Sequence, residues 1–169
     1  PMLKMEWVQG DSLGAYVAKN VANSQKLIAL AGRWIEMSNA LNTVGMAHGD
    51  LQHGNVLIMP DGQIKLIDYD GMYIPALAGR PSEELGQRNY QHPLRTAMDF
   101  GPNLDHFSEW VIYVSLMLLS LDPTLWTKVK GGDECLLFRK ADFEDPERSL
   151  AFKTMESAKD DRVRFLADA

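Results

Sequence analysis

The 169-residue sequence has a single cysteine, Cys135, so it can form neither an internal disulfide nor a metal site of several thiolates. Lysine and arginine total 17 against 23 aspartates and glutamates, a formal net charge of −6, and no run of basic residues occurs. Functions that depend on attraction to a phosphate backbone need the opposite charge balance. We therefore expect no nucleic acid partner.

Long hydrophobic runs are also missing. The most apolar uncharged stretch, Trp110 to Leu121, falls well short of the roughly 20 residues that a membrane span needs, so we expect a core helix and no membrane partner. The first residues lack the basic and apolar segments of a signal peptide. With the lone cysteine, these absences predict a cytoplasmic protein. The chain begins at Pro1 with residues typical of the end of a strand, which suggests a piece cut from a longer protein.

The composition is typical of a soluble globular domain, with 46% hydrophobic, 24% charged and 9% aromatic residues, and no linker divides it. Apolar spacing and turn residues predict mainly helices with one small hairpin. The expected helices are 11–20, 24–43, 105–121, one near Trp126, 146–155 and 160–167. The expected strands are 2–8, 55–59 and 63–67, and residues 71–104, which contain four prolines, are expected to be mostly irregular.

Polar side chains gather around the predicted hairpin. The segment His48–Asn55 lies between the long helix and the hairpin, and Asp68 follows the hairpin's second strand. We therefore expect the hairpin to bring Asp50, Asn55 and Asp68 together. Phosphoryl transfer needs one carboxylate to orient a hydroxyl and oxygen ligands to hold Mg²⁺ on the phosphates, and these residue types supply both.

These residues carry a family resemblance. His48–Asn55 matches the catalytic loop H-R-D-L-x-x-x-N of protein kinases at every fixed position except the arginine, and Asp68 begins the sequence Asp-Tyr-Asp where D-F-G is expected. The chain resembles the C-terminal lobe of a protein kinase. The resemblance implies that Asp50 is the catalytic base and that Asn55 and Asp68 bind Mg²⁺, with His48 and Tyr69 as structural members of the site.

The same resemblance implies a nucleotide site. Met5–Val8 is similar to the hinge between the two lobes of a kinase, where backbone groups of Glu6 and Val8 would meet the adenine of ATP. Leu13 and Leu57 are similar to the apolar residues beneath the adenine ring. ATP and Mg²⁺ are therefore the expected cofactors.

Two further landmarks follow in the family's order. Asn89–Pro93 is similar to a divergent A-P-E region, which closes the activation segment that begins at Asp68. Asp105–Ser108 is similar to the start of the family's central buried helix, whose aspartate steadies the catalytic loop. As an alternative, Asp105 is only a helix N-cap, or it is both.

The resemblance predicts a mainly helical kinase-like C-terminal lobe that occupies residues 1–169 and starts at the hinge. The chain has no G-x-G-x-x-G loop and no V-A-I-K lysine, so we expect the N-terminal lobe to be absent from it and the chain alone to bind ATP poorly. The expected activity is ATP- and Mg²⁺-dependent transfer of the γ-phosphate to a Ser or Thr hydroxyl of a protein.

Departures from the motifs keep other functions open. Gly49 replaces the arginine that reads activation-loop phosphorylation, Gln52 replaces a common lysine, and Asp70 replaces the motif glycine. These changes motivate a pseudokinase that acts as a binding module. His-Gly-Asp is also typical of small-molecule kinases similar to the aminoglycoside and choline kinases, so the acceptor is a protein or a small hydroxyl compound.

A metal site of another kind is a further alternative. His53 could join His48, Asp50 and Asp68 as ligands of a transition metal, because imidazole and carboxylate are competent ligands. The spacing fits no known metal motif, and the kinase interpretation is preferred.

Overall fold

The computed structural model describes residues 9–158, 161 and 164. The described part is mainly helical and carries one small antiparallel sheet, with the order β1-β2-β3. The elements in chain order are β1 (Asp11–Ser12), α1 (Leu13–Asn20), α2 (Ser24–Thr43), β2 (Val56–Ile58), β3 (Ile64–Leu66), η1 (Pro75–Leu77), η2 (Arg88–Tyr90), α3 (His106–Leu121), α4 (Thr124–Lys128), α5 (Lys140–Glu144), η3 (Pro146–Arg148) and α6 (Leu150–Glu156).

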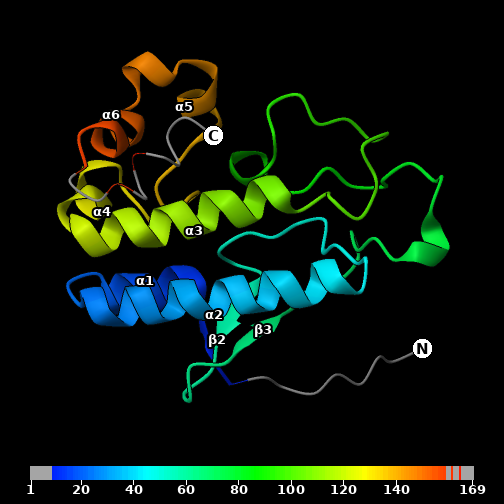
Figure 1. Cartoon of the computed structure of the whole chain (residues 1–169), viewed down its shortest axis with the longest axis horizontal. Helices are drawn as coiled ribbons and strands as arrows, with labels where there is room; N and C mark the ends of the chain where they lie inside the picture. Colours follow the sequence, from blue (N-terminus) through cyan, green and yellow to red (C-terminus); the bar gives the residue numbers. More distant parts are fainter. Residues whose placement is uncertain (1–8, 159–160, 162–163, 165–169) are drawn as a thin grey trace.

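Helices α2 and α3 form the centre of the fold and lie side by side along their length (Figure 1). The apolar stripe of α2 is buried, as its spacing predicts, and α3 is buried on most of its faces. Trp34 of α2 is 2% exposed, and its indole N–H donates to the carbonyl of Glu109 in α3 at 3.0 Å. This bond satisfies a polar group that burial would otherwise leave unpaired.

The sheet lies on the side of α2 that faces away from α3 (Figure 1). Val56 pairs with Leu66 and Ile58 with Ile64 across the hairpin, which confirms the two predicted strands with slightly shorter bounds. The turn between them contains Gly62 at φ +81°, a conformation that glycine adopts without steric cost. A third strand, β1, pairs with β2 and was not expected, because two residues carry no periodic pattern.

Helices α4, α5 and α6 cover α3 on its other side (Figure 1). Trp110 of α3 packs against Phe138, Phe143 of α5 and Phe152 of α6, with ring centroids 5.7–6.4 Å apart. The prediction of a single helix over 146–155 is wrong. A 3₁₀ turn, η3, occupies its start. Ser149 then adopts an extended conformation, which separates η3 from α6, and its side chain caps α6.

Residues 71–104 lie between β3 and α3 in the chain; the segment extends beyond the ends of α2 and α3, and η2 within it lies against α3 (Figure 1). In this segment only η1 and η2 are helical, which confirms the expected irregular course. The segment is tied back by an antiparallel bridge between Ala47 and Tyr73, two buried residues. It therefore starts directly beside the loop that leads to Asp50.

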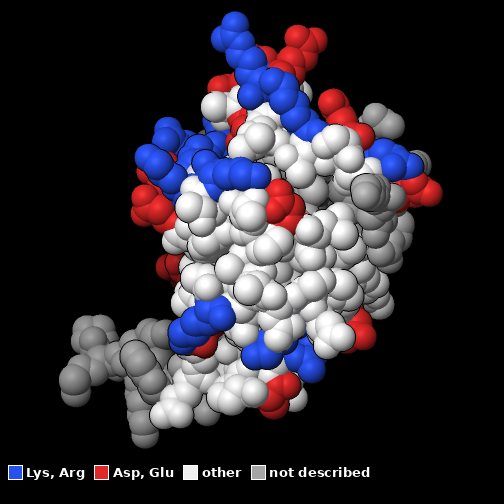
Figure 2. Space-filling view, turned by 90° about the vertical axis from the view of Figure 1, so that its left-hand side faces the viewer, with Lys and Arg blue, Asp and Glu red and all other residues white. Residues whose placement is uncertain are grey.

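Two predicted elements lie wholly or largely outside the described residues, namely the strand 2–8 and the helix 160–167. Within the described part, no helix combines the length and apolar character that crossing a membrane demands. Figure 2 shows one end of the molecule, where acidic and basic side chains alternate around a largely uncharged centre.

Candidate active site

The loop that carries Asp50 is fixed by Asp105 at the start of α3. The two carboxylate oxygens of Asp105 accept the backbone N–H groups of His48 and of Gly49, the latter at 2.9 Å. Asp105 is 2% exposed, and burial raises its pKa, while the two bonds and the His48 ring oppose that shift. Its side chain makes no capping bond to α3. Asp105 therefore occupies the N-cap position of α3, but its side chain anchors the loop and does not cap the helix, so the interpretation as an N-cap alone is wrong.

Gly49 occupies a position that no other residue fits. Its φ is +84°, and a Cβ atom built on it would lie 2.1 Å from the carbonyl oxygen of Gly71. A side chain here would meet backbone, which cannot move aside as a flexible side chain can. The fold itself thus excludes the arginine that the kinase motif has at this position.

Arg95, from the segment 71–104, contacts the loop at Gly49. Arg95 donates to the carbonyl of Gly49 at 3.0 Å and also bonds the side-chain oxygen of Gln91. Burial lowers the pKa of Arg95, and the nearby carboxylates of Asp105 and Asp50 oppose that shift. The guanidinium therefore remains charged and joins the segment 71–104 to the loop of Asp50.

Asp50 is half-buried, and both of its carboxylate oxygens are oriented by neighbours. One oxygen accepts the side-chain N–H of Asn55 at 3.0 Å, and the other accepts the backbone N–H of Gln87 at 2.7 Å. Asn55 also donates to the Asp50 carbonyl at 3.1 Å. A carboxylate oxygen accepts more than one hydrogen bond, so these contacts fix Asp50 and leave it able to receive a substrate hydroxyl.

Asp68 lies beside this pair through backbone contacts. The N–H of Ile67 donates to the Asn55 carbonyl at 3.0 Å, and the buried His48 ring bonds the Ile67 carbonyl at 2.9 Å. Asp68 follows Ile67 with φ +66°, a left-handed conformation that aspartate tolerates better than most residues, and it is exposed. Tyr69 is half-exposed, with its ring centroid 5.7 Å from that of His48.

The residues at this site are suited to Mg²⁺. The amide nitrogen of Asn55 is engaged by Asp50, which leaves the amide oxygen as the atom for a cation, and the exposed Asp68 supplies a second oxygen donor. Mg²⁺ is usually held by one or two such protein ligands together with phosphate oxygens. Asn55 and Asp68 together therefore match the donor set that Mg²⁺ needs.

A transition-metal site does not form around His53. In the described part of the chain, no group of three or more His, Cys, Asp or Glu residues is placed to hold a metal ion. The His53 ring is instead bonded to the Tyr90 hydroxyl at 2.8 Å and to the Asp133 carbonyl at 3.2 Å. Burial lowers the pKa of His53, which favours the neutral ring that these two bonds require.

The expected adenine contacts are only partly described. Leu13 is 1% exposed at the start of α1, and Leu57 lies in β2 and is partly exposed. The sheet brings them close, because Leu57 pairs with Ser12, the residue before Leu13. Glu6 and Val8 lie outside the described residues.

The motifs did not identify two residues that contact the loop of Asp50. Gln87 and Arg95 lie 37 and 46 positions away from the residues they bond, in the irregular segment. No spacing rule connects such distant positions. The one available signal was chemical. The loop of Asp50 lacks the arginine of the kinase motif, and the segment 71–104 contains an arginine, Arg95, that could take its place.

Comparisons with known proteins agree with the resemblance. Residues 1–78 match the family described as the ABC1 atypical kinase-like domain. Calcium-dependent protein kinase 9 of Oryza sativa subsp. japonica is 29% identical over 161 residues, which are 90% of this chain and 28% of that protein. Serine/threonine-protein kinase pakA of Talaromyces marneffei is 31% identical over 65 residues, 38% of this chain and 10% of that protein.

A third relative, serine/threonine-protein kinase SMU1 of Mycosarcoma maydis, is 25% identical over 115 residues, 67% of this chain and 15% of that protein. The chain thus spans less than a third of each of these curated relatives. The matched family, the kinase relatives and the helical fold with its small antiparallel sheet agree with one another. They support the resemblance of the chain to the protein kinase-like family.

Proposed function

We propose that the chain is part of a phosphotransferase that uses ATP and Mg²⁺ to phosphorylate a Ser or Thr hydroxyl of a protein. Residues 1–169 would form its C-terminal lobe, and an N-terminal lobe would supply the glycine-rich loop and lysine that the sequence lacks. The observation that carries the proposal is the double orientation of the Asp50 carboxylate by Asn55 and Gln87.

Each residue has a distinct task in this reaction. Asp50 accepts a hydrogen bond from the acceptor hydroxyl and receives its proton as the new P–O bond forms. Asn55 keeps Asp50 in place through its amide nitrogen and presents its oxygen, with Asp68, toward the metal position. When bound, Mg²⁺ neutralises charge that develops on the phosphate oxygens. Asp105 holds the loop backbone and does not touch the reactants.

The test is phosphate transfer by the full-length protein with radiolabelled ATP and a panel of acceptors. Asp50→Asn should lower kcat by about 10²- to 10⁴-fold, the usual contribution of a general base. Asp70→Asn is the matched control, because Asp70 is an exposed turn residue two positions after Asp68. Unchanged turnover in Asp50→Asn, or an equal loss in the control, would contradict the assignment.

A pseudokinase is the second candidate, and one contact favours it. The side chain of Gln52, which stands where many kinases have a lysine, turns back and accepts the N–H of Gly54 at 3.0 Å. It is therefore engaged within its own loop. Mg²⁺-dependent transfer to any peptide, aminoglycoside or choline would exclude this candidate, and the preferred acceptor class would separate a protein kinase from a small-molecule kinase.

A further inference from the structure

A small basic cavity opens beside Asp50 on the segment 71–104. Its volume is about 110 Å³, and four of its lining side chains are basic: Arg88, His92, Arg95 and Lys140. Among the described residues, no carboxylate lines it. In a chain whose formal net charge is −6, this concentration of positive charge runs against the overall balance.

Gly86 connects the cavity to the proposed catalytic residue. It lines the cavity, and a Cβ atom built on it would lie 2.7 Å from a carboxylate oxygen of Asp50. The N–H of the next residue, Gln87, donates to that same oxygen. The cavity therefore lies next to the position where an acceptor hydroxyl would meet Asp50.

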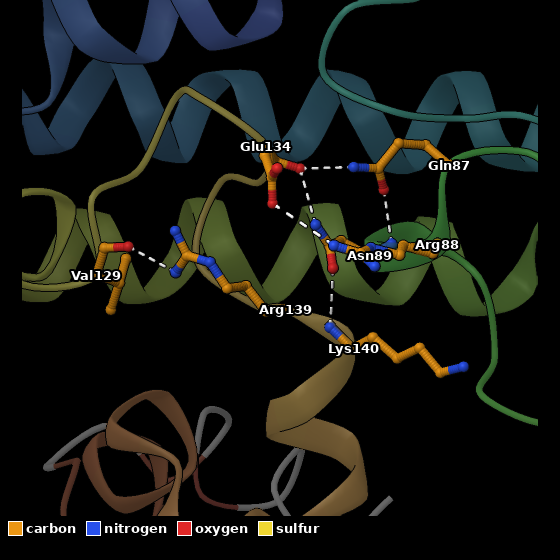
Figure 3. A network of polar contacts seen from close by, with 7 residues as sticks. All are labelled: Gln87, Arg88, Asn89, Val129, Glu134, Arg139 and Lys140. Atoms are coloured by element: carbon orange, nitrogen blue, oxygen red, sulfur yellow. Dashed lines mark hydrogen bonds and ion pairs between the residues drawn. The ribbon is translucent and has the colours of Figure 1, made fainter.

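The backbone around the cavity is held mainly by amide and backbone groups. Figure 3 shows Gln87 and Asn89 donating to the Glu134 carbonyl at 2.8 and 3.1 Å, while the backbone N–H of Lys140 donates to Asn89 at 2.9 Å. The ammonium group of Lys140 takes no part in this network. The network therefore fixes the wall that carries Arg88 and Lys140, and of these two charged groups it uses only the Arg88 guanidinium, which lies 4.0 Å from the Glu134 carboxylate.

The existing partners of the cations are weak competitors for an anion. Arg88 is paired with Glu134 at 4.0 Å and Lys140 with Glu144 at 3.7 Å, and all four side chains are well exposed. Exposed ion pairs of this kind contribute little to stability. The guanidinium of Arg95 donates to the carbonyls of Gly49 and Glu84 rather than to carboxylates.

We propose that this cavity binds an anionic side chain, carboxylate or phosphoryl, carried by a residue next to the acceptor Ser or Thr in a protein substrate. The volume supports one such group, since it equals roughly four waters at about 30 Å³ each. This inference rests on the proposed function and names its substrate class as acidic protein segments. Charge complementarity carries it, because a cluster of cations at the acceptor position favours an anionic partner and disfavours a basic one.

The experiment compares peptides that differ at one position beside the acceptor serine, with the full-length protein as enzyme. The aspartate peptide should have a kcat/KM about tenfold above that of the asparagine peptide, and the lysine peptide should be the poorest. The double variant Arg88→Glu with Lys140→Glu should reverse this order. Arg80→Glu is the control, since Arg80 is an exposed residue of the same segment that does not line the cavity.

Equal kcat/KM for the aspartate and asparagine peptides would overturn the inference while the proposed function stood. A preference for glycerol phosphate over every peptide would overturn both the inference and the proposed protein acceptor, because the acceptor would then be a small molecule. If no acceptor is phosphorylated, the proposed function fails. The role of the cavity is then tested by peptide binding instead of by turnover. A fluorescent aspartate peptide with alanine in place of serine should bind the wild type more tightly than the double variant, and equal binding would overturn the inference.

Discussion

The loop of Asp50 (residues 47–55) and the segment 71–104 meet at one site but are held in different ways. The loop is buried at His48, Leu51 and Asn55, and its backbone is fixed by the Asp105 carboxylate. About half of the segment's residues are exposed, and beyond the Ala47–Tyr73 bridge at its start it is attached largely through side chains such as Arg95 and Asn89. We conclude that the position of the proposed base depends on backbone geometry, whereas the proposed acceptor surface depends on replaceable side chains.

The largest expected effect is on the backbone contact of the loop. Gly49→Ala places a methyl group 2.1 Å from the Gly71 oxygen at a positive φ, so the free energy of unfolding should fall by about 3 kcal/mol. Urea denaturation measures this change. Gly79→Ala is the matched control at φ +83°, because its Cβ would meet nothing within 4 Å, and about 1 kcal/mol is expected there. Equal losses of stability in the two variants would show that the positive φ, and not the contact with Gly71, accounts for the cost at both positions.

The anchor of the loop gives the next largest effect. Asp105→Asn replaces one acceptor oxygen with a donor that faces an N–H of the loop, so the free energy of unfolding should fall by about 2 kcal/mol. Asp99→Asn makes the same chemical change in the segment, where an exposed carboxylate accepts the Thr96 N–H at 2.7 Å. There we expect a much smaller change in the free energy of unfolding, because the carboxylate is fully exposed. A larger loss at Asp99 would reverse the comparison between the two regions.

Removing the side-chain link should release the segment and leave the loop intact. Arg95→Met should cost about 1 kcal/mol in global stability, because the buried Gly49 carbonyl that it leaves behind still accepts a long bond from the Gln91 side chain at 3.4 Å. Hydrogen exchange should speed up at Gln87 and change little at Gly49. Arg95→Lys keeps the charge but not the forked geometry of the guanidinium, so its effect should lie between those of the wild type and of Arg95→Met. The control Arg80→Met should alter exchange at neither Gln87 nor Gly49. Faster exchange at Gly49 would mean that the loop also depends on Arg95.

The smallest effect is a pH dependence from the contact of His53 with Tyr90. Burial lowers the pKa of His53 below its ordinary 6.5, so the unfolded chain binds more protons in that range. The free energy of unfolding should therefore fall as the pH drops below about 6.5. Asp105 and Glu109, whose pKa values burial raises, act in the opposite direction at lower pH. The difference in the free energy of unfolding between the wild type and His53→Gln, measured as a function of pH, isolates the contribution of the histidine. If the two curves run parallel, His53 has no such role.

Local patterns predicted much of the fold because they act over a few residues. The spacing in 24–43 predicted α2 with its observed bounds, and Pro60-Asp61-Gly62 marked the hairpin. The helix α5 was missed because five residues are too short to show a period. The residues Asp50 and Asn55 were placed together correctly, since only five positions separate them and their side chains bond directly.

The sequence by itself determined the helical frame, the hairpin and the motif residues of a kinase-like chain. Only the tertiary structure decided that Gly49 must be glycine, that Arg95 bonds the loop of Asp50, and that Arg88 and Lys140 line one cavity. The physical reason is the separation in sequence over which each kind of interaction acts. Propensity and periodicity act between neighbours, whereas a close backbone approach or a cluster of charges exists only once distant segments have packed together.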